Sequence, residues 1–183
     1  CICPGSRNTP LNTIFIKDKF FNCSTHIDER SAGFFSLGIT KSSLKPTVII
    51  TTSGTAIANL MPAIIESDLS MNPLIILTAD RPKRLLNTGA NQTINQKKIF
   101  NNFVRGTIHI ENVKLKSLKK TQKDIQSLIN KSIGINNQLP PGPIHINIGF
   151  DEPLLNKKES INFRHTIKKQ NSIINKKLII QNY

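Results

Sequence analysis

Short apolar runs rich in β-branched residues alternate with longer stretches of helical periodicity along most of this chain. The runs predict strands at Ile2–Cys3, Ser24–Ile27, Thr47–Thr51, Leu74–Thr78 and Ile144–Ile148. The longer stretches predict helices at about Thr9–Lys17, Glu29–Ser42, Thr55–Ser67, Asn95–Asn102 and Ser117–Ile133. Strands that alternate with helices pair in parallel, so the sequence predicts a doubly wound parallel α/β sheet with helices on both faces.

Polar motifs follow four of the predicted strands. "PGSR" follows the first strand, "DER" the second, "TSGTA" the third and "ADRP" the fourth. Ligands of open parallel sheets bind beyond the carboxyl ends of the strands, so we expect these motifs to converge on one rim. This rim is the predicted functional site.

Two of these motifs suit the binding of anions. Arg7 offers a planar guanidinium that fits a carboxylate, although a surface Arg beside a capping Ser6 is the alternative on this stretch alone. Backbone N–H groups near Ser53, Gly54 and Thr55 start a helix and could meet an anion or a cofactor edge. The segment lacks the Lys of a phosphate-binding loop and the first Gly of a nucleophile elbow, which argues against an NTPase and a serine hydrolase.

The two other motifs have both a functional and a plain interpretation. Arg81 follows the fourth strand, and Gln92 lies further along the same turn-rich loop, which can also be an ordinary surface loop. Glu29 stands directly before a small, apolar helical segment. A carboxylate there is favoured by the unpaired backbone donors of the first helical turn, so simple capping is the alternative to catalysis.

The length of 183 residues and the hydrophobic content of 38% allow one core of ordinary size. Residues 1–155 carry the alternating pattern and are predicted to form one domain, with its N-terminus incomplete because "CICPGSR" already resembles the end of a strand. Residues 156–183 are rich in Lys and Asn and are predicted to be a linker toward a further domain. No uninterrupted apolar run would span a bilayer.

The formal net charge of +14 raises the alternative of a basic nucleic-acid-binding module. The excess lies mostly downstream of the motifs: residues 1–113 hold 12 Lys and Arg against 7 Asp and Glu, whereas residues 114–183 hold 13 against 4. This pattern favours a solvated helix face and a polar linker, so no nucleic-acid partner is expected.

Cysteine and histidine residues show no metal-binding pattern. Cys1, Cys3 and Cys23 are odd in number and lack C-x-x-C spacing, which argues against a disulfide framework and a zinc site and fits a reducing compartment. The four histidines are scattered without ligand spacing. We therefore expect no metal ligand in this chain.

Five ordered segments carry a resemblance to one family. They are "CPGSRNTPL", "HIDERSAGFFSLGITKSS", "TTSGTAIANLMPAIIES", "PLIILTADRPKRLLNTGANQTINQ" and "GPIHINIGFDEPL". Together they resemble the N-terminal pyrimidine-binding domain of the SEPHCHC synthases, the MenD family, over about residues 1–155. SEPHCHC is 2-succinyl-5-enolpyruvyl-6-hydroxy-3-cyclohexene-1-carboxylate, and these are thiamine-diphosphate enzymes of menaquinone and phylloquinone biosynthesis. Another thiamine-dependent decarboxylase or synthase is the nearest alternative.

The resemblance implies an activity and an assembly. Such enzymes decarboxylate 2-oxoglutarate and add the succinyl group to isochorismate, in a bacterial cytoplasm or a plastid stroma. Thiamine diphosphate lies between the pyrimidine-binding domain of one subunit and the diphosphate-binding domain of another, which implies a homodimer or homotetramer. No G-D-G segment with a downstream Asn occurs in the 183 residues, so the ligands of Mg²⁺ and diphosphate are expected elsewhere and the chain alone is expected to be inactive.

The resemblance also assigns roles to residues. Glu29 is implied to be the acid that hydrogen-bonds the aminopyrimidine ring of the cofactor, a role that burial favours by disfavouring the charged carboxylate. Cofactor contacts are further implied for Ser53, Gly54, Thr55 and Gln92. Substrate contacts are implied for Ser6, Arg7, Arg81 and Gln92, with the two arginines as partners of carboxylates. The chain departs from the usual family pattern at Lys83, Arg84, Gly149 and Asp151, outside the residues implied in the chemistry.

Overall fold

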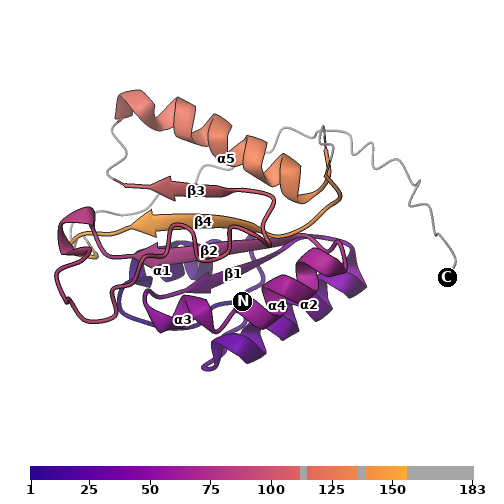
Figure 1. The fold of residues 1–183 in the computed structure, drawn as a ribbon, viewed down its shortest axis with the longest axis horizontal. Helices are drawn as coiled ribbons and strands as arrows, with labels where there is room; N and C mark the ends of the chain where they lie inside the picture. Colours follow the sequence, from indigo (N-terminus) through magenta and orange to yellow (C-terminus); the bar gives the residue numbers. More distant parts are fainter. Residues whose placement is uncertain (112–114, 136–138, 156–183) are drawn as a thin grey trace, which may run out of the picture.

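A parallel four-stranded sheet forms the centre of the molecule (Figure 1). The computed structural model describes residues 1–111, 115–135 and 139–155, so the predicted linker at residues 156–183 lies outside the described part. The strands are β1 (Thr47–Thr51), β2 (Leu74–Asp80), β3 (Thr107–Ile110) and β4 (Ile144–Gly149), in the order β1-β2-β4-β3. All three pairings are parallel, which confirms the predicted α/β class.

Helices cover both faces of this sheet (Figure 1). One face carries α1 (Thr9–Lys17) and α5 (Leu118–Ser132), and the other carries α2 (Glu29–Ser43), α3 (Thr55–Ala58) and α4 (Met61–Leu69). Two short 3₁₀ helices, Lys83–Leu85 and Leu115–Ser117, lie in the connections. The doubly wound arrangement is thus as predicted.

Alternation along the strands divides the core into two clusters. Ile50 of β1 and Leu77 of β2 pack with Leu11 of α1 on one face. The preceding residues, Ile49 and Ile76, point the other way and pack with α2, α3 and α4. Burying one such side chain contributes about 1.5 to 3 kcal/mol to the stability of the fold. Because each face of the sheet has its own cluster, packing stabilises the sheet from both sides.

Three predicted elements differ in extent. Ile2 forms isolated parallel bridges to Thr25 and Ile50, so the first two predicted strands reach only bridge length beside β1. The predicted helix 55–67 is two helices, α3 and α4. The break precedes Pro62, which stands in the first turn of α4 and has no N–H to donate to the carbonyl four residues earlier.

The predicted helix Asn95–Asn102 is wrong. This segment is a run of turns with short-range hydrogen bonds, such as Asn101 N–H to the Lys98 carbonyl at 3.2 Å. Phe100 is buried in the core below it, and Gln96 is fully buried. Sequence reasoning also missed β3, whose four residues are all only partly buried at the edge of the sheet.

Candidate functional site

The loops at the carboxyl ends of the strands form one edge of the sheet, which we call the rim. These loops meet at the turn between β1 and α3. A Cβ atom on Gly5 would lie 2.5 Å from the Cβ of Thr52, so only glycine allows the first loop to approach this turn so closely. Gly54 has a φ of 81°, and a Cβ there would lie 3.0 Å from the Cα of Gln92. The loop that follows β2 therefore packs directly on the turn.

Arg81 and Gln92 both contact Ser53. The Arg81 Nη1 donates a hydrogen bond to the buried Ser53 Oγ, and the Gln92 Nε2 donates to the Ser53 carbonyl at 3.4 Å. The structure thus brings together four of the residues that the sequence singled out, Ser53, Gly54, Arg81 and Gln92.

Arg7 lies close to Arg81 on the same rim. Burial, and next the positive charge of Arg7, lower the pKa of Arg81, whereas Asp80 and Glu152 act in the opposite direction. Arg7 is itself buried, and its guanidinium donates to the Phe150 carbonyl and to Glu152, both at 3.1 Å. Ser6 is exposed beside it. Two cations at one rim make a surface suited to dicarboxylates.

The side chain that caps α2 belongs to Asp28 and not to Glu29. Asp28 is the N-cap of α2, and its side chain accepts a hydrogen bond from the Ser31 N–H at 2.7 Å. Glu29 is the first helical residue, and its Oε2 accepts from Asn59 Nδ2 at 3.3 Å. Burial, and next the negative charge of Glu29, raise the pKa of the Cys3 thiol to about 12. The Glu29 carboxylate therefore lies near Cys3.

Glu29 is less buried than the sequence predicts. Glu29 is only partly buried, and Ile27 just before the helix is 91% exposed. Phe34, Phe35 and Ile39 are also exposed on the outer face of α2. Within the described residues, Glu29 forms no hydrogen bond or ion pair with Arg7 or Arg81. The predicted catalytic acid is therefore still partly open to solvent in this chain.

Gln96 is the main structural residue of the rim that sequence reasoning missed. Its Oε1 accepts from the Gly54 N–H at 2.8 Å, and its Nε2 donates to the Ala79 carbonyl at 3.1 Å and to Asn147 Oδ1 at 2.9 Å. One side chain thus joins the β1–α3 turn to the ends of β2 and β4. The Gly54 N–H is already paired, so it is not free for an anion as the sequence suggested.

Replacing Gln96 with leucine is expected to lower the free energy of unfolding by about 2 to 3 kcal/mol. The change leaves the buried Gly54 N–H and Ala79 carbonyl without this partner, and an unpaired buried polar group costs about 1 to 3 kcal/mol. Urea denaturation measures the loss. The control is Gln122→Leu on the exposed side of α5, which should stay within about 0.5 kcal/mol of the parent. Equal effects of both changes would contradict the role of Gln96.

A chain of buried hydrogen bonds extends from Gln96 beneath the rim. Asn147 Nδ2 donates to Asp80 Oδ2 at 2.7 Å and bonds with His109 Nδ1 at 2.9 Å. His109 Nε2 in turn lies 2.7 Å from Glu111 Oε1. Burial is the main cause that raises the pKa of Asp80, which lies directly before Arg81. The network holds the ends of β2, β3 and β4 at fixed separations.

His145 lies at the inner end of this network. Thr78 Oγ1 donates its proton to Asn147 Oδ1 at 2.7 Å, so the contact of 2.8 Å with His145 Nε2 requires the histidine to donate. Its Nδ1 is buried without a partner. Burial, and secondarily His109, lower the pKa of His145 to about 3. The histidine is therefore neutral in the folded protein.

This state of His145 predicts a pH dependence of stability. The unfolded chain takes up a proton near pH 6.5 that the folded chain takes up only near pH 3, so His145 contributes stability above pH 6.5 that is lost as pH falls. We expect the His145→Gln variant to lose this component, which is at most about 1.4 kcal/mol per pH unit between pH 6.5 and 4.5. Urea unfolding of parent and variant at several pH values measures it; parallel curves would contradict it. Asp80 is present in both proteins, so its own contribution to stability cancels in the comparison. That contribution changes with pH in the opposite direction, because its pKa is raised in the folded protein.

Residues 1–99 match the thiamine pyrophosphate enzymes, in the part described as the N-terminal TPP binding domain. The chain belongs to the thiamine pyrophosphate enzyme family. The match spans the residues around Arg7, Glu29, Ser53, Arg81 and Gln92. The rim described above is thus part of a TPP binding domain.

Three curated proteins to which this chain is similar carry the name 2-succinyl-5-enolpyruvyl-6-hydroxy-3-cyclohexene-1-carboxylate synthase. The identity is 41% with the protein from Chloroflexus aurantiacus, 45% with that from Synechococcus sp. and 43% with that from Bacillus velezensis. Each alignment covers 84% of this chain, but only 26%, 27% and 26% of the respective relative. The chain therefore spans about a quarter of the length of these relatives.

Three further findings concern membrane-spanning helices, metal sites and thiols. Among the helices in the described part of the chain, none has the length and apolar character needed to cross a membrane. Across residues 1–111, 115–135 and 139–155, no group of three or more His, Cys, Asp or Glu side chains is arranged to hold a metal ion. Cys1, Cys3 and Cys23 are free thiols.

Proposed function

We propose that this chain supplies the pyrimidine-binding part of a thiamine-diphosphate-dependent SEPHCHC synthase, which decarboxylates 2-oxoglutarate and adds the succinyl group to isochorismate. The observation that supports it most is the 41–45% identity with relatives of that name over 84% of the chain. Mg²⁺ and the residues that hold it and the diphosphate belong to a domain outside these 183 residues in this proposal, because no G-D-G segment occurs in them.

The residues of the rim fit the pyrimidine end of the cofactor. Glu29 has a carboxyl group with one long hydrogen bond of 3.3 Å, so it retains capacity for a further partner. The apolar side chains of Ile27, just before α2, and of Phe34 and Phe35 on α2 are exposed and suit a second protein surface. When bound, thiamine diphosphate supplies the carbon that attacks the 2-oxo acid and accepts the charge left after carbon dioxide departs.

Glu29 is assigned the catalytic role in this proposal. Its carboxyl group holds a proton and shares it with a ring nitrogen of the pyrimidine, as a positioned general acid. A protonated carboxyl is favoured where water is excluded, and the partly exposed Glu29 requires a second surface for this. Asp28 caps α2 and thereby stabilises the first turn of the helix, which begins at Glu29.

Arg7 and Arg81 bind the substrate carboxylates in this proposal. Both substrates carry carboxylates, and the guanidinium fork matches them geometrically. Ser6 is exposed beside Arg7 and is assigned a hydrogen bond to the same substrate. Gln92 lies against Ser53 and is assigned to the boundary between substrate and cofactor. Ser53, Gly54 and Thr55 form the wall of the cofactor site, with the Gly54 N–H held by Gln96.

The uncovered face of α2 supports an assembly in which a second subunit completes the site. Ile27 is 91% exposed, and Phe34 and Phe35 are 46% and 48% exposed. Contiguous exposed apolar side chains of this size commonly mark protein interfaces. We assign this face to the diphosphate-binding domain of a second subunit, in a homodimer or homotetramer. Free thiols fit the cytoplasm or a plastid stroma as the compartment.

The proposal predicts no turnover by the 183-residue chain alone and turnover after the missing domains are supplied. For the second test, residues 1–155 replace the matching segment of the Bacillus velezensis synthase. Product formation from isochorismate and 2-oxoglutarate, with thiamine diphosphate and Mg²⁺, is followed by mass spectrometry for both proteins. Turnover by the chain alone would contradict the missing-ligand argument.

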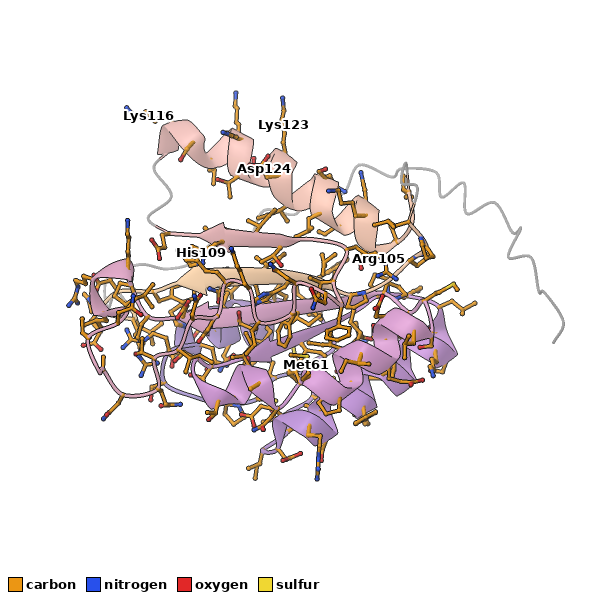
Figure 2. All side chains as sticks on the ribbon, viewed as in Figure 1. Met61, Arg105, His109, Lys116, Lys123 and Asp124 are labelled. Carbon is orange, nitrogen blue, oxygen red and sulfur yellow. The ribbon has the colours of Figure 1, made fainter. Side chains whose placement is uncertain are left out.

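The hybrid enzyme also distinguishes the alternatives. Decarboxylation without transfer to isochorismate would indicate another thiamine-dependent decarboxylase or synthase. A folded hybrid that binds the cofactor but performs neither reaction would contradict the proposed function. The remaining alternative is a basic nucleic-acid-binding module, for which Lys116 and Lys123, which extend away from the sheet, would be candidate contacts (Figure 2). Such a module would show an affinity for polynucleotides that falls steeply as the salt concentration rises.

A further inference from the structure

The segment after β4 places two successive acids against two arginines of the rim loops. Asp151 accepts from Arg84 at 2.6 Å and 3.2 Å through Nη2 and Nε, and both side chains are largely exposed. Glu152 accepts from Arg7 Nη2 at 3.1 Å. These adjacent carboxylates therefore have different partners, one on the surface and one at the proposed substrate site.

The Arg7–Glu152 pair is unequal in burial. The Arg7 side chain is 9% exposed, whereas that of Glu152 is 70% exposed. Arg7 Nη1 also donates to the Phe150 carbonyl at 3.1 Å, which keeps the guanidinium in place independently of Glu152. The carboxylate can thus leave toward solvent while the arginine stays in position.

Arg7 has unused capacity for a carboxylate. Its Nε is buried and has no hydrogen-bond partner, although the neighbouring Nη2 is bound to one oxygen of Glu152. A carboxylate that binds an arginine with both oxygens uses two such N–H donors at once. Glu152 therefore uses only one of these two donors.

We propose that Glu152 is a resident competitor that occupies Arg7 in the free protein and gives way to a carboxylate of a substrate. The inference rests on the proposed function, because that function makes Arg7 a carboxylate-binding residue. In the free protein, Glu152 offsets the repulsion between the neighbouring Arg7 and Arg81. Exchange of one carboxylate for another preserves this charge balance in the complex.

The chemistry specifies a carboxylate, which both isochorismate and 2-oxoglutarate carry. A site that is closed for 70 to 90% of the time raises the apparent dissociation constant by about three- to tenfold. We therefore expect Glu152→Gln to bind one of these two compounds roughly three to ten times more tightly than the parent chain. The compound whose affinity changes is the one that Arg7 receives.

The test uses the full 183-residue chain with ¹⁵N-labelled arginine. The Arg7 side-chain signals are followed by NMR during separate titrations with isochorismate and 2-oxoglutarate. Asp151→Asn is the matched control, because it makes the same charge change at the next residue but contacts Arg84 instead. Glu152→Asp keeps the charge and shortens the side chain, so it is also expected to tighten binding. Thermal unfolding checks that each variant is folded.

Tighter binding by both Glu152 variants, an unchanged Asp151→Asn and lost binding in Arg7→Ala would support the inference. Equal, measurable affinities in the parent and the Glu152 variants would overturn it and leave the proposed function intact. An equal gain in Asp151→Asn would also overturn it, because the effect would then be one of net charge. Absence of binding of both compounds by every folded variant would overturn it and also count against the proposed substrate role of Arg7.

Discussion

Replacing Glu29 with glutamine is expected to slow exchange of the C2 proton of bound thiamine diphosphate by about a hundredfold to ten-thousandfold, the range for a positioned acid or base. Glutamine keeps the size and can accept the hydrogen bond from Asn59, but it cannot hold the acidic proton. The measurement is hydrogen–deuterium exchange followed by quench and NMR, in the hybrid synthase that carries residues 1–155. Stability should stay within about 1 kcal/mol of the parent.

The adjacent acid provides a matched control for this experiment. Asp28 accepts the capping hydrogen bond from Ser31, so Asp28→Ala should cost about 0.5 to 2 kcal/mol of stability. Its effect on C2 exchange should be far smaller than that of Glu29→Gln. If Glu29→Gln exchanges as fast as the parent while its stability falls, Glu29 has a structural role and the catalytic assignment is wrong.

Replacing Arg81 with alanine is expected to weaken the use of isochorismate by roughly one to two orders of magnitude. A hydrogen bond to a charged group contributes about 1.5 to 3 kcal/mol, and the Arg81 guanidinium lies at the rim beside Ser53 and Arg7. Decarboxylation of 2-oxoglutarate should fall less, because the role assigned to Arg81 is toward the acceptor. Separate steady-state assays of the two half-reactions in the hybrid enzyme measure the difference.

The control for Arg81 is Arg84→Ala in the same loop. Arg84 pairs with Asp151 at the surface, so its removal should change neither half-reaction by more than about twofold. An equal loss in both half-reactions on replacing Arg81 would assign this residue to the cofactor or to the fold. That result would contradict its proposed role as a partner of the acceptor carboxylate.

The sheet and the position of the rim could be predicted from the sequence because both follow from local patterns. Thr47–Thr51 is a β-branched run with turn residues after it, and the structure has β1 at those bounds. Once parallel strands are expected, topology alone places the residues that follow them at one edge. The contacts of Ser53 with Arg81 and Gln92 agree with that placement.

The contacts that hold the rim together could not be predicted, because they depend on side chains distant in sequence. The residues around Gln96 predict a helix, but its amide pairs with Gly54, Ala79 and Asn147 instead. These buried hydrogen bonds outweigh the weak helix preference of the segment. The sequence also could not show that Asp28 caps the helix while Glu29 pairs with Asn59, because two adjacent acids look equivalent in a sequence.

The pairing of Arg7 with Glu152 joins residues 145 positions apart and has no local signature. The sequence motif predicted only that Arg7 would be available to a carboxylate. In the structure, a carboxylate of the same chain already occupies it. The partial exposure of Glu29 also differs from its expected burial, because the described residues cover it only in part.

The most direct test of the central claim is a crystal structure of the hybrid synthase with thiamine diphosphate bound. We predict that a carboxyl oxygen of Glu29 lies at hydrogen-bond distance, about 2.6 to 3.0 Å, from a ring nitrogen of the aminopyrimidine. We also predict that the outer face of α2 is covered by a second subunit. A structure in which the cofactor is bound, α2 is covered and Glu29 still points only to Asn59 would contradict the assignment of Glu29 as the activating acid.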